Sequence, residues 1–140
     1  MFARILVGLD GSEAAHHALT VALDLAVLCG AEVHAASIEE RLPAYAATVG
    51  EVEDEEGFAH DYFQEIQTRA RRTAAERGVA FDGSILPGHA AQALTRLARE
   101  GGFDLIVVGH TGHSRLHHLF LGSTADRVVE GASCPVLVVR

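Results

Sequence analysis

Apolar runs and amphipathic stretches alternate along this chain from end to end. Five short apolar runs have the pattern of buried strands, at residues 4–9, 31–38, 79–86, 104–108 and 136–139. Between them, apolar residues recur at intervals of three and four, which predicts helices over residues 13–29, 58 to near 78, 90–100 and 123–130. The stripe of the second helix is expected at Phe58, Tyr62, Ile66 and Ala70.

The alternation of strands and helices predicts an α/β fold, a doubly wound, Rossmann-like sheet of five parallel strands with helices on both faces. A length of 140 residues suits one domain, which we expect to span residues 1–140. In such a sheet the ligand site lies outside the carboxyl ends of the strands, where the strand order reverses. If the order is 3-2-1-4-5, that point falls between the first and fourth strands, which end beside Asp10 and Gly109.

The segment from residue 39 to about 54 interrupts this pattern. It has no clear period, and it carries Pro43, Gly50 and several acidic residues. We predict a long connection here, which is a candidate for a lid over the site or for a partner surface. The acidic residues between Glu51 and Glu56 are predicted to lie in a solvated loop and at the start of the next helix, where the helix dipole favours them.

Composition narrows the possible function classes. The formal net charge of −8 argues against a nucleic-acid partner. No apolar run is long enough to cross a membrane and the N-terminus passes directly into a strand, so we expect a cytoplasmic protein with no membrane partner. All eleven basic side chains are arginine. The absence of lysine excludes the P-loop and Schiff-base chemistry.

The motif with the most chemical content begins where the run 104–108 ends. Gly109-His110-Thr111-Gly112 is followed, after nine residues, by Gly122-Ser123-Thr124 at the start of the last predicted helix. Glycines tolerate positive φ and let a ligand approach the backbone closely, and a helix N-terminus offers unpaired N–H groups. The motif therefore predicts a phosphate-binding site.

Three segments resemble the universal stress protein family. They are the opening Ile5-Leu6-Val7-Gly8-Leu9-Asp10-Gly11-Ser12, the spacing Gly109-x2-Gly112-x9-Gly122-Ser123 of the ATP-binding branch, and the closing Cys134-Pro135-Val136-Leu137-Val138-Val139. The resemblance covers the whole chain. It implies a UspA-like domain with strand order 3-2-1-4-5, usually a homodimer, that binds an adenine nucleotide and acts in stress response and signalling.

The resemblance also implies a set of nucleotide-binding positions. Asp10 should lie by the ribose or the metal-bridged phosphates, Ile38 should meet the adenine through its backbone, and Val108 should flank the ligand. The glycines and hydroxyls of the motif should surround the phosphates, and Arg115 is a candidate to pair with one of them. The full set is Gly8, Asp10, Ile38, Val108, Gly109, Gly112, Arg115, Gly122, Ser123 and Thr124. The implied cofactor is ATP, with Mg²⁺ held mainly by its phosphates.

Two other chemistries are compatible with the same loop. His110-Thr111-Gly112-His113 and Ser123-Thr124-Ala125-Asp126-Arg127 have the forms HxGH and STxxR, which resemble motifs of nucleotidylyltransferases. In those enzymes the first motif follows the first strand and the second comes most of a domain later, so order and spacing argue against this interpretation. A metal site is a further hypothesis, for the four histidines His110, His113, His117 and His118, but they fall in a predicted loop between glycines. We assign no metal ligands and no catalytic residues.

The sequence favours a binding module over an enzyme. It shows no general base and no acidic pair placed for two metals, so efficient ATP hydrolysis is not predicted, whereas slow hydrolysis through a metal held by the phosphates and Asp10 stays open. A dimeric interaction module that binds no nucleotide is the remaining alternative. The apolar strand Val136–Val139 would leave main-chain groups unpaired at a sheet edge, which predicts a homodimer paired through this strand.

Overall fold

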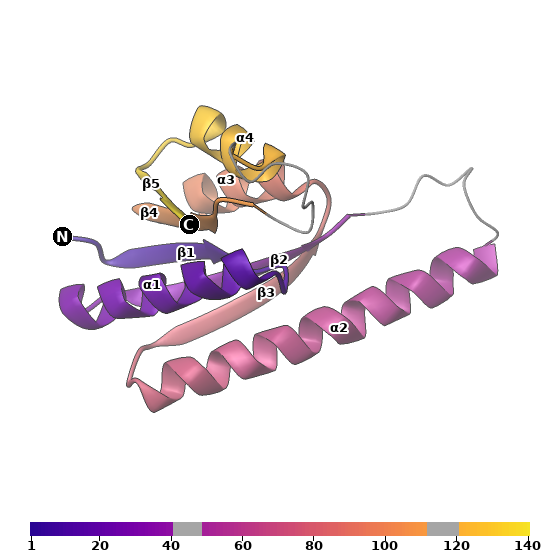
Figure 1. The fold of residues 1–140 in the computed structure, drawn as a ribbon, viewed down its shortest axis with the longest axis horizontal. Coiled ribbons are helices and arrows are strands. Elements are labelled where there is room, and N and C mark those ends of the chain that lie inside the picture. Colours follow the sequence, from indigo (N-terminus) through magenta and orange to yellow (C-terminus); the bar gives the residue numbers. More distant parts are fainter. Residues whose placement is uncertain (41–48, 112–120) are drawn as a thin grey trace.

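The computed structural model describes residues 1–40, 49–111 and 121–140, and the side chains of residues 1–40, 57–111 and 121–140. Five parallel strands form one sheet (Figure 1). Along the chain they are β1 (Arg4–Gly8), β2 (Glu32–Glu39), β3 (Phe81–Pro87), β4 (Leu105–Gly109) and β5 (Val136–Val139). Their spatial order is β3-β2-β1-β4-β5, which confirms the predicted doubly wound α/β fold.

Helices cover both faces of the sheet (Figure 1). On one face lie α1 (Glu13–Cys29) and α2 (Val49–Glu76), and on the other lie α3 (Ala90–Glu100) and α4 (Ser123–Gly131). Each face has its own apolar core, and β1 contributes to both. Ile5 and Val7 pack on the α1 side, Leu6 packs on the α3 side, and all three are fully buried. A strand buried on both faces has no polar side, which explains why β1 is an unbroken apolar run.

Helix α2 begins earlier than the sequence pattern indicated. The predicted connection over residues 39–54 is wrong at both ends, because Glu39 closes β2 and residues 49–54 already belong to α2. Residues 41–48, which also fall in that prediction, lie outside the described residues. The N-terminal end of α2 extends beyond the sheet (Figure 1). It therefore has no core to face and shows no apolar period, although its acidic residues suit a helix N-terminus. None of the helices in the described part of the chain has the length and apolar character of a membrane span.

One polar side chain of α2 is buried against the sheet. Gln67 is 8% exposed, and its Nε2 donates to the carbonyl of Ala35 at 3.1 Å and to Oγ of Ser37 at 2.9 Å. The Ser37 hydroxyl donates in turn to the carbonyl of Leu9 at 2.6 Å. Gln67 thereby links α2, β2 and the residue that follows β1. A buried donor that satisfies several acceptors is costly to remove, because each acceptor is then left without water or a partner.

We predict that Gln67→Met lowers the free energy of unfolding by about 1–3 kcal/mol, since methionine keeps the volume and removes the donor. Urea unfolding followed by circular dichroism measures the change. Gln64→Met is the matched control, because Gln64 is exposed one turn earlier on the same helix. Equal effects of the two substitutions would contradict the role given to Gln67.

Candidate functional site

A cavity of about 530 Å³ lies at the carboxyl ends of β1, β2 and β4. Its position follows from the winding of the chain. After β1 the chain enters α1 on one face of the sheet, and the helix that comes after β4, α4, lies on the other face (Figure 1). The two connections diverge, and the space between them is the switch-point crevice expected for this fold.

The cavity brings together residues that are far apart in the sequence. Eight of the ten predicted site residues line it, namely Gly8, Asp10, Ile38, Val108, Gly109, Gly122, Ser123 and Thr124. The other two, Gly112 and Arg115, lie outside the described residues, as do His113, His117 and His118. The expected set therefore shares one cavity, while the contact of each residue with a ligand stays a prediction.

The N-terminus of α4 forms one wall of the cavity. Its N-cap, Gly122, makes no side-chain cap bond, and the first intrahelical bond runs from the N–H of Asp126 to the carbonyl of Gly122 at 3.0 Å. The N–H groups of Ser123, Thr124 and Ala125 precede that bond and have no acceptor within the helix. All three residues line the cavity. This wall carries the partial positive charge of a helix start, which favours an anion.

A second helix start faces the same space. The N-cap of α3, His89, makes no side-chain cap bond, and Ala90 in the first turn lines the cavity. The start of α1 differs, because Oγ of Ser12 accepts the N–H of Ala15 at 3.1 Å. Of the three helices that begin around the cavity, α3 and α4 thus offer their first N–H groups without a side-chain cap.

Asp10 places a carboxylate between these helix starts. Its Oδ1 accepts the N–H of Ser12 at 2.9 Å, which fixes the side chain beside the beginning of α1. Within the described residues, no three side chains of His, Cys, Asp or Glu gather to hold a metal ion. A divalent cation near Asp10 would therefore take most of its oxygen ligands from a bound phosphate and from water, which is how Mg²⁺ commonly binds.

The β2 side of the cavity is mainly apolar. Ile38 lines it together with Phe63 of α2 and Leu94 of α3, and Glu40 adds one carboxylate just after β2. The sequence pattern did not indicate Phe63, because the predicted stripe of α2 ran through Phe58 and Tyr62. These two side chains are 82% and 44% exposed. The predicted Ile66 and Ala70 do pack against the core, whereas Phe58 and Tyr62 do not. Phe63 and the buried polar Gln67 continue the inward face instead, and the polar residue hid its apolar period.

Gly109 is required by packing. The φ of Gly109 is not positive, so this position does not need the conformational freedom of glycine. A Cβ at Gly109 would lie 2.7 Å from the carbonyl carbon of Ala14 in the first turn of α1. Gly122 also has an ordinary φ of −61°. Positive φ therefore explains neither glycine, and at Gly109 the reason is close backbone approach to a helix.

His110 points toward the sheet edge. Its Nδ1 lies 3.3 Å from the carbonyl oxygen of Val139, and its carbonyl accepts the N–H of Gly122 at 2.6 Å. Of the two residues that follow Gly109, Thr111 lines the cavity and His110 does not. This orientation adds to the argument from motif order against a catalytic HxGH.

These features define a doubly wound α/β domain with a ligand cavity at its switch point. The whole chain, residues 1–140, matches the profile of the Universal stress protein family. The chain belongs to this family, as its three segments indicated.

Individual relatives match over nearly their full length. The chain is 33% identical to Universal stress protein MJ0531 of Methanocaldococcus jannaschii, over 100% of this chain and 83% of that protein. It is 36% identical to a universal stress protein of Thermus aquaticus, over 100% of both chains. It is also similar to a solved universal stress protein in complex with cAMP, with a TM-score of 0.77, 26% identity and coverage of 99% of this chain and 97% of that chain.

We predict that Gly109→Ala lowers the free energy of unfolding of the nucleotide-free protein by about 1–3 kcal/mol, because the new methyl group overlaps the backbone of α1. Thermal unfolding after removal of any bound ligand measures the effect. Gly8→Ala is the comparison, since a Cβ there meets Cδ1 of Leu94, at 3.1 Å, at the end of a flexible side chain. An unchanged melting temperature for Gly109→Ala would show that packing on Ala14 does not require glycine.

Proposed function

We propose that this protein binds ATP together with Mg²⁺ in the switch-point cavity and acts as a nucleotide-dependent module in stress response and signalling. The observation that carries the proposal is that two helices without side-chain caps begin at one cavity. The volume of about 530 Å³ is within the usual range of small-molecule sites. A polyanion joined to an apolar ring matches a cavity with helix starts on one side and an apolar wall on the other.

The strand order suggests how the ligand lies. The phosphates are assigned to the β4 side, where Gly109 and the start of α4 both line the cavity. The adenine is assigned to the β2 side, near Ile38 and Phe63. Two strand spacings, about 10 Å, separate β2 from β4, so a base and a phosphate chain can occupy different walls.

Mg²⁺ is expected to bind with the phosphates. Among the described residues no arginine lines the cavity, so backbone N–H groups and a cation would have to balance the charge of the phosphates. Asp10 is the carboxylate placed to meet the cation or the ribose. The cation would neutralise phosphate charge. Asp10, whose side chain is held in place by the N–H of Ser12, would orient the cation.

The lining supports binding rather than fast turnover. In its described part it contains neither histidine nor cysteine, and its carboxylates are Asp10 and Glu40. Asp10 is assigned to the cation or the ribose, and Glu40 follows β2, on the side assigned to the base. Among the described lining residues, none is thereby assigned to activate water at a terminal phosphate. The cAMP complex of a relative supports an adenine nucleotide as the ligand class.

We expect calorimetry to detect binding of Mg-ATP by the purified protein and Gly122→Val to abolish it, because the branched side chain would crowd the cavity at the start of α4. Val129→Ser is the matched control, since Val129 lies on the same helix and is 48% exposed. EDTA should weaken ATP binding. The absence of binding heat with Mg-ATP, together with no adenine nucleotide released on heating, would contradict the proposed function.

We also propose a homodimer joined through β5. This strand is one edge of the sheet, and all four of its residues are partly exposed. The carbonyls of Pro135 and Val139 accept the N–H groups of Ile106 in β4 and of His110 just after it. The alternate residues Val136 and Val138 therefore direct their main-chain groups outward. A second copy of the same strand would pair these groups around a two-fold axis.

Val138→Pro should convert the dimer to a monomer while preserving the fold, because proline removes an outward N–H and spares the bonds to β4. Light scattering coupled to size exclusion measures the mass. Val138→Thr keeps the N–H and should remain dimeric. A monomeric wild-type protein, or a dimeric Val138→Pro variant, would contradict pairing through β5.

A further inference from the structure

The strands β2 and β3 lie side by side at one edge of the sheet (Figure 1). They carry a second group of polar side chains, none of which lines the cavity described above. Nε2 of His34 on β2 lies 2.9 Å from Oγ of Ser84 on β3. Nδ1 of the same ring lies 3.7 Å from Oδ2 of Asp82. Hydroxyl, imidazole and carboxylate follow one another in the order of a nucleophile, its base and the acid that orients the base.

The register of the two strands produces this arrangement. His34 lies directly opposite Asp82, and Ser84 is two residues further along the same face of β3. Oδ1 of Asp82 accepts the N–H of Gly83 at 2.8 Å, which leaves Oδ2 toward the imidazole. From the other face, Nε2 of Gln67 lies 3.3 Å from the carbonyl of Ser84. The three side chains are therefore mounted on a rigid part of the sheet.

The surroundings of His34 favour a neutral ring. Burial lowers the pKa of His34 below its usual 6.5. The negative charges of Asp82 and Glu32 oppose this shift, and the positive charge of Arg4 adds to it. The net effect is a lowered pKa, so at neutral pH the ring is uncharged and able to accept a proton from Ser84.

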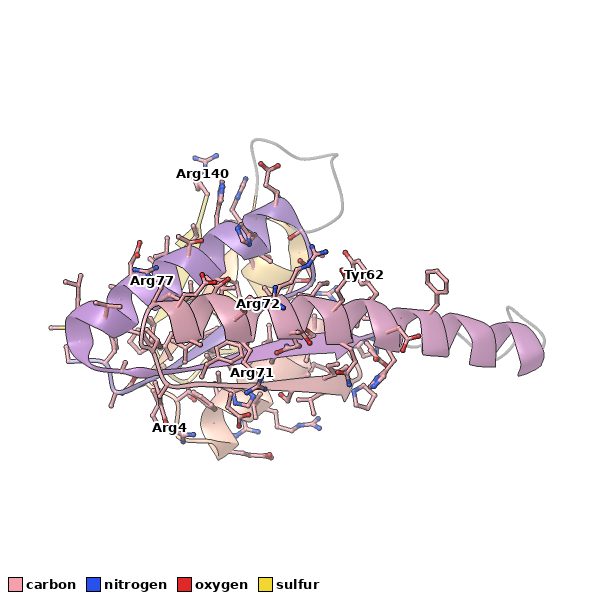
Figure 2. The ribbon with its side chains drawn as sticks, turned by 90° about the horizontal axis from the view of Figure 1, so that it is seen from below. Arg4, Tyr62, Arg71, Arg72, Arg77 and Arg140 are labelled. Atoms are coloured by element: carbon pink, nitrogen blue, oxygen red, sulfur yellow. The ribbon has the colours of Figure 1, made fainter. Side chains whose placement is uncertain are left out.

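The cluster is open to small molecules. Ser84 is half-buried, and the side chain of Asp82 is 77% exposed. A cavity of about 150 Å³ beside the ring is lined by His34, Asp82, Arg4 and Phe103. The Arg4 guanidinium, labelled in Figure 2, stacks over the Phe103 ring at 4.5 Å from its centroid. Ser84 does not line this space, and Nε of Arg4 is ion-paired with Oε1 of Glu32 at 2.5 Å, so an acyl group would be received at the partly exposed Ser84 hydroxyl itself.

We propose that Ser84 is a histidine-activated nucleophile that accepts acyl groups from small activated esters. Oγ of Ser84 bonds to the carbonyl carbon while its proton passes to Nε2 of His34. The ester C–O bond then breaks, and the leaving oxygen takes the proton from His34. Water attacks the acyl-serine by the same proton route, which releases the carboxylic acid and restores Ser84. None of these residues lines the nucleotide cavity, so the activity is independent of ATP binding.

The test uses the full chain and p-nitrophenyl acetate, with p-nitrophenolate release followed by absorbance and the acetyl group located by peptide mass spectrometry. The chain has no lysine, so the usual background acceptor is absent. We expect an acetyl group on Ser84, its loss in Ser84→Ala, and a fall in acylation rate on the order of a hundredfold in His34→Gln. His16→Gln, which changes an exposed histidine on α1, should leave the rate unchanged.

The pH profile separates a catalytic arrangement from a structural one. Acylation requires neutral His34, so the rate should rise with pH around a midpoint below 6.5. Asp82→Asn removes a charge that raises the pKa of His34, so this midpoint should move to lower pH. If Ser84→Ala fails to fold, Ser84→Cys keeps a nucleophile and should carry the acetyl group at position 84. Acetylation that spares residue 84, or a folded His34→Gln variant with the wild-type rate, overturns the proposal.

Discussion

The close approach of the end of β4 to the first turn of α1 is the contact on which the switch-point cavity depends. At Gly109 the backbone comes so near to Ala14 that a Cβ would overlap the helix backbone. This contact holds the end of β4 beside the place where the chain leaves β1. From there α1 lies on one face of the sheet and α4 on the other, and the space between them cannot close. A bulkier residue at Gly109 would push apart the walls that form the cavity.

The cavity uses the main chain where many anion sites use basic side chains. In its described part it contains no arginine, and the chain as a whole has a net charge of −8. Such a site attracts anions only over short range, through the N–H groups at the starts of α3 and α4. In the proposed function, much of the phosphate charge would be left to Mg²⁺.

Gln67 connects the two polar regions of the molecule. Through Ser37 it reaches the carbonyl of Leu9, a residue that lines the switch-point cavity. Through the carbonyl of Ser84 it reaches the strand that carries the proposed nucleophile. Its side chain also occupies the space that a Cβ at Gly83 would fill. A single buried amide thus fixes the strand positions at two sites, because a hydrogen-bonded polar group shielded from water tolerates little movement.

The sequence by itself determined the order of strands and helices along the chain, because strands buried on both faces must be apolar and helix starts carry recognisable residues. Its glycine motif and its resemblance to the family indicated eight of the residues that line the cavity. It missed the first turns of α2, which face no core, and Phe63, whose stripe is interrupted by Gln67. The sequence also did not show why position 109 requires glycine, because Ala14, whose backbone Gly109 approaches, is remote in sequence. Only the tertiary structure decided that His34 meets Ser84, fifty residues away. Periodicity shows which face of an element is buried, whereas the register between strands decides which side chains touch.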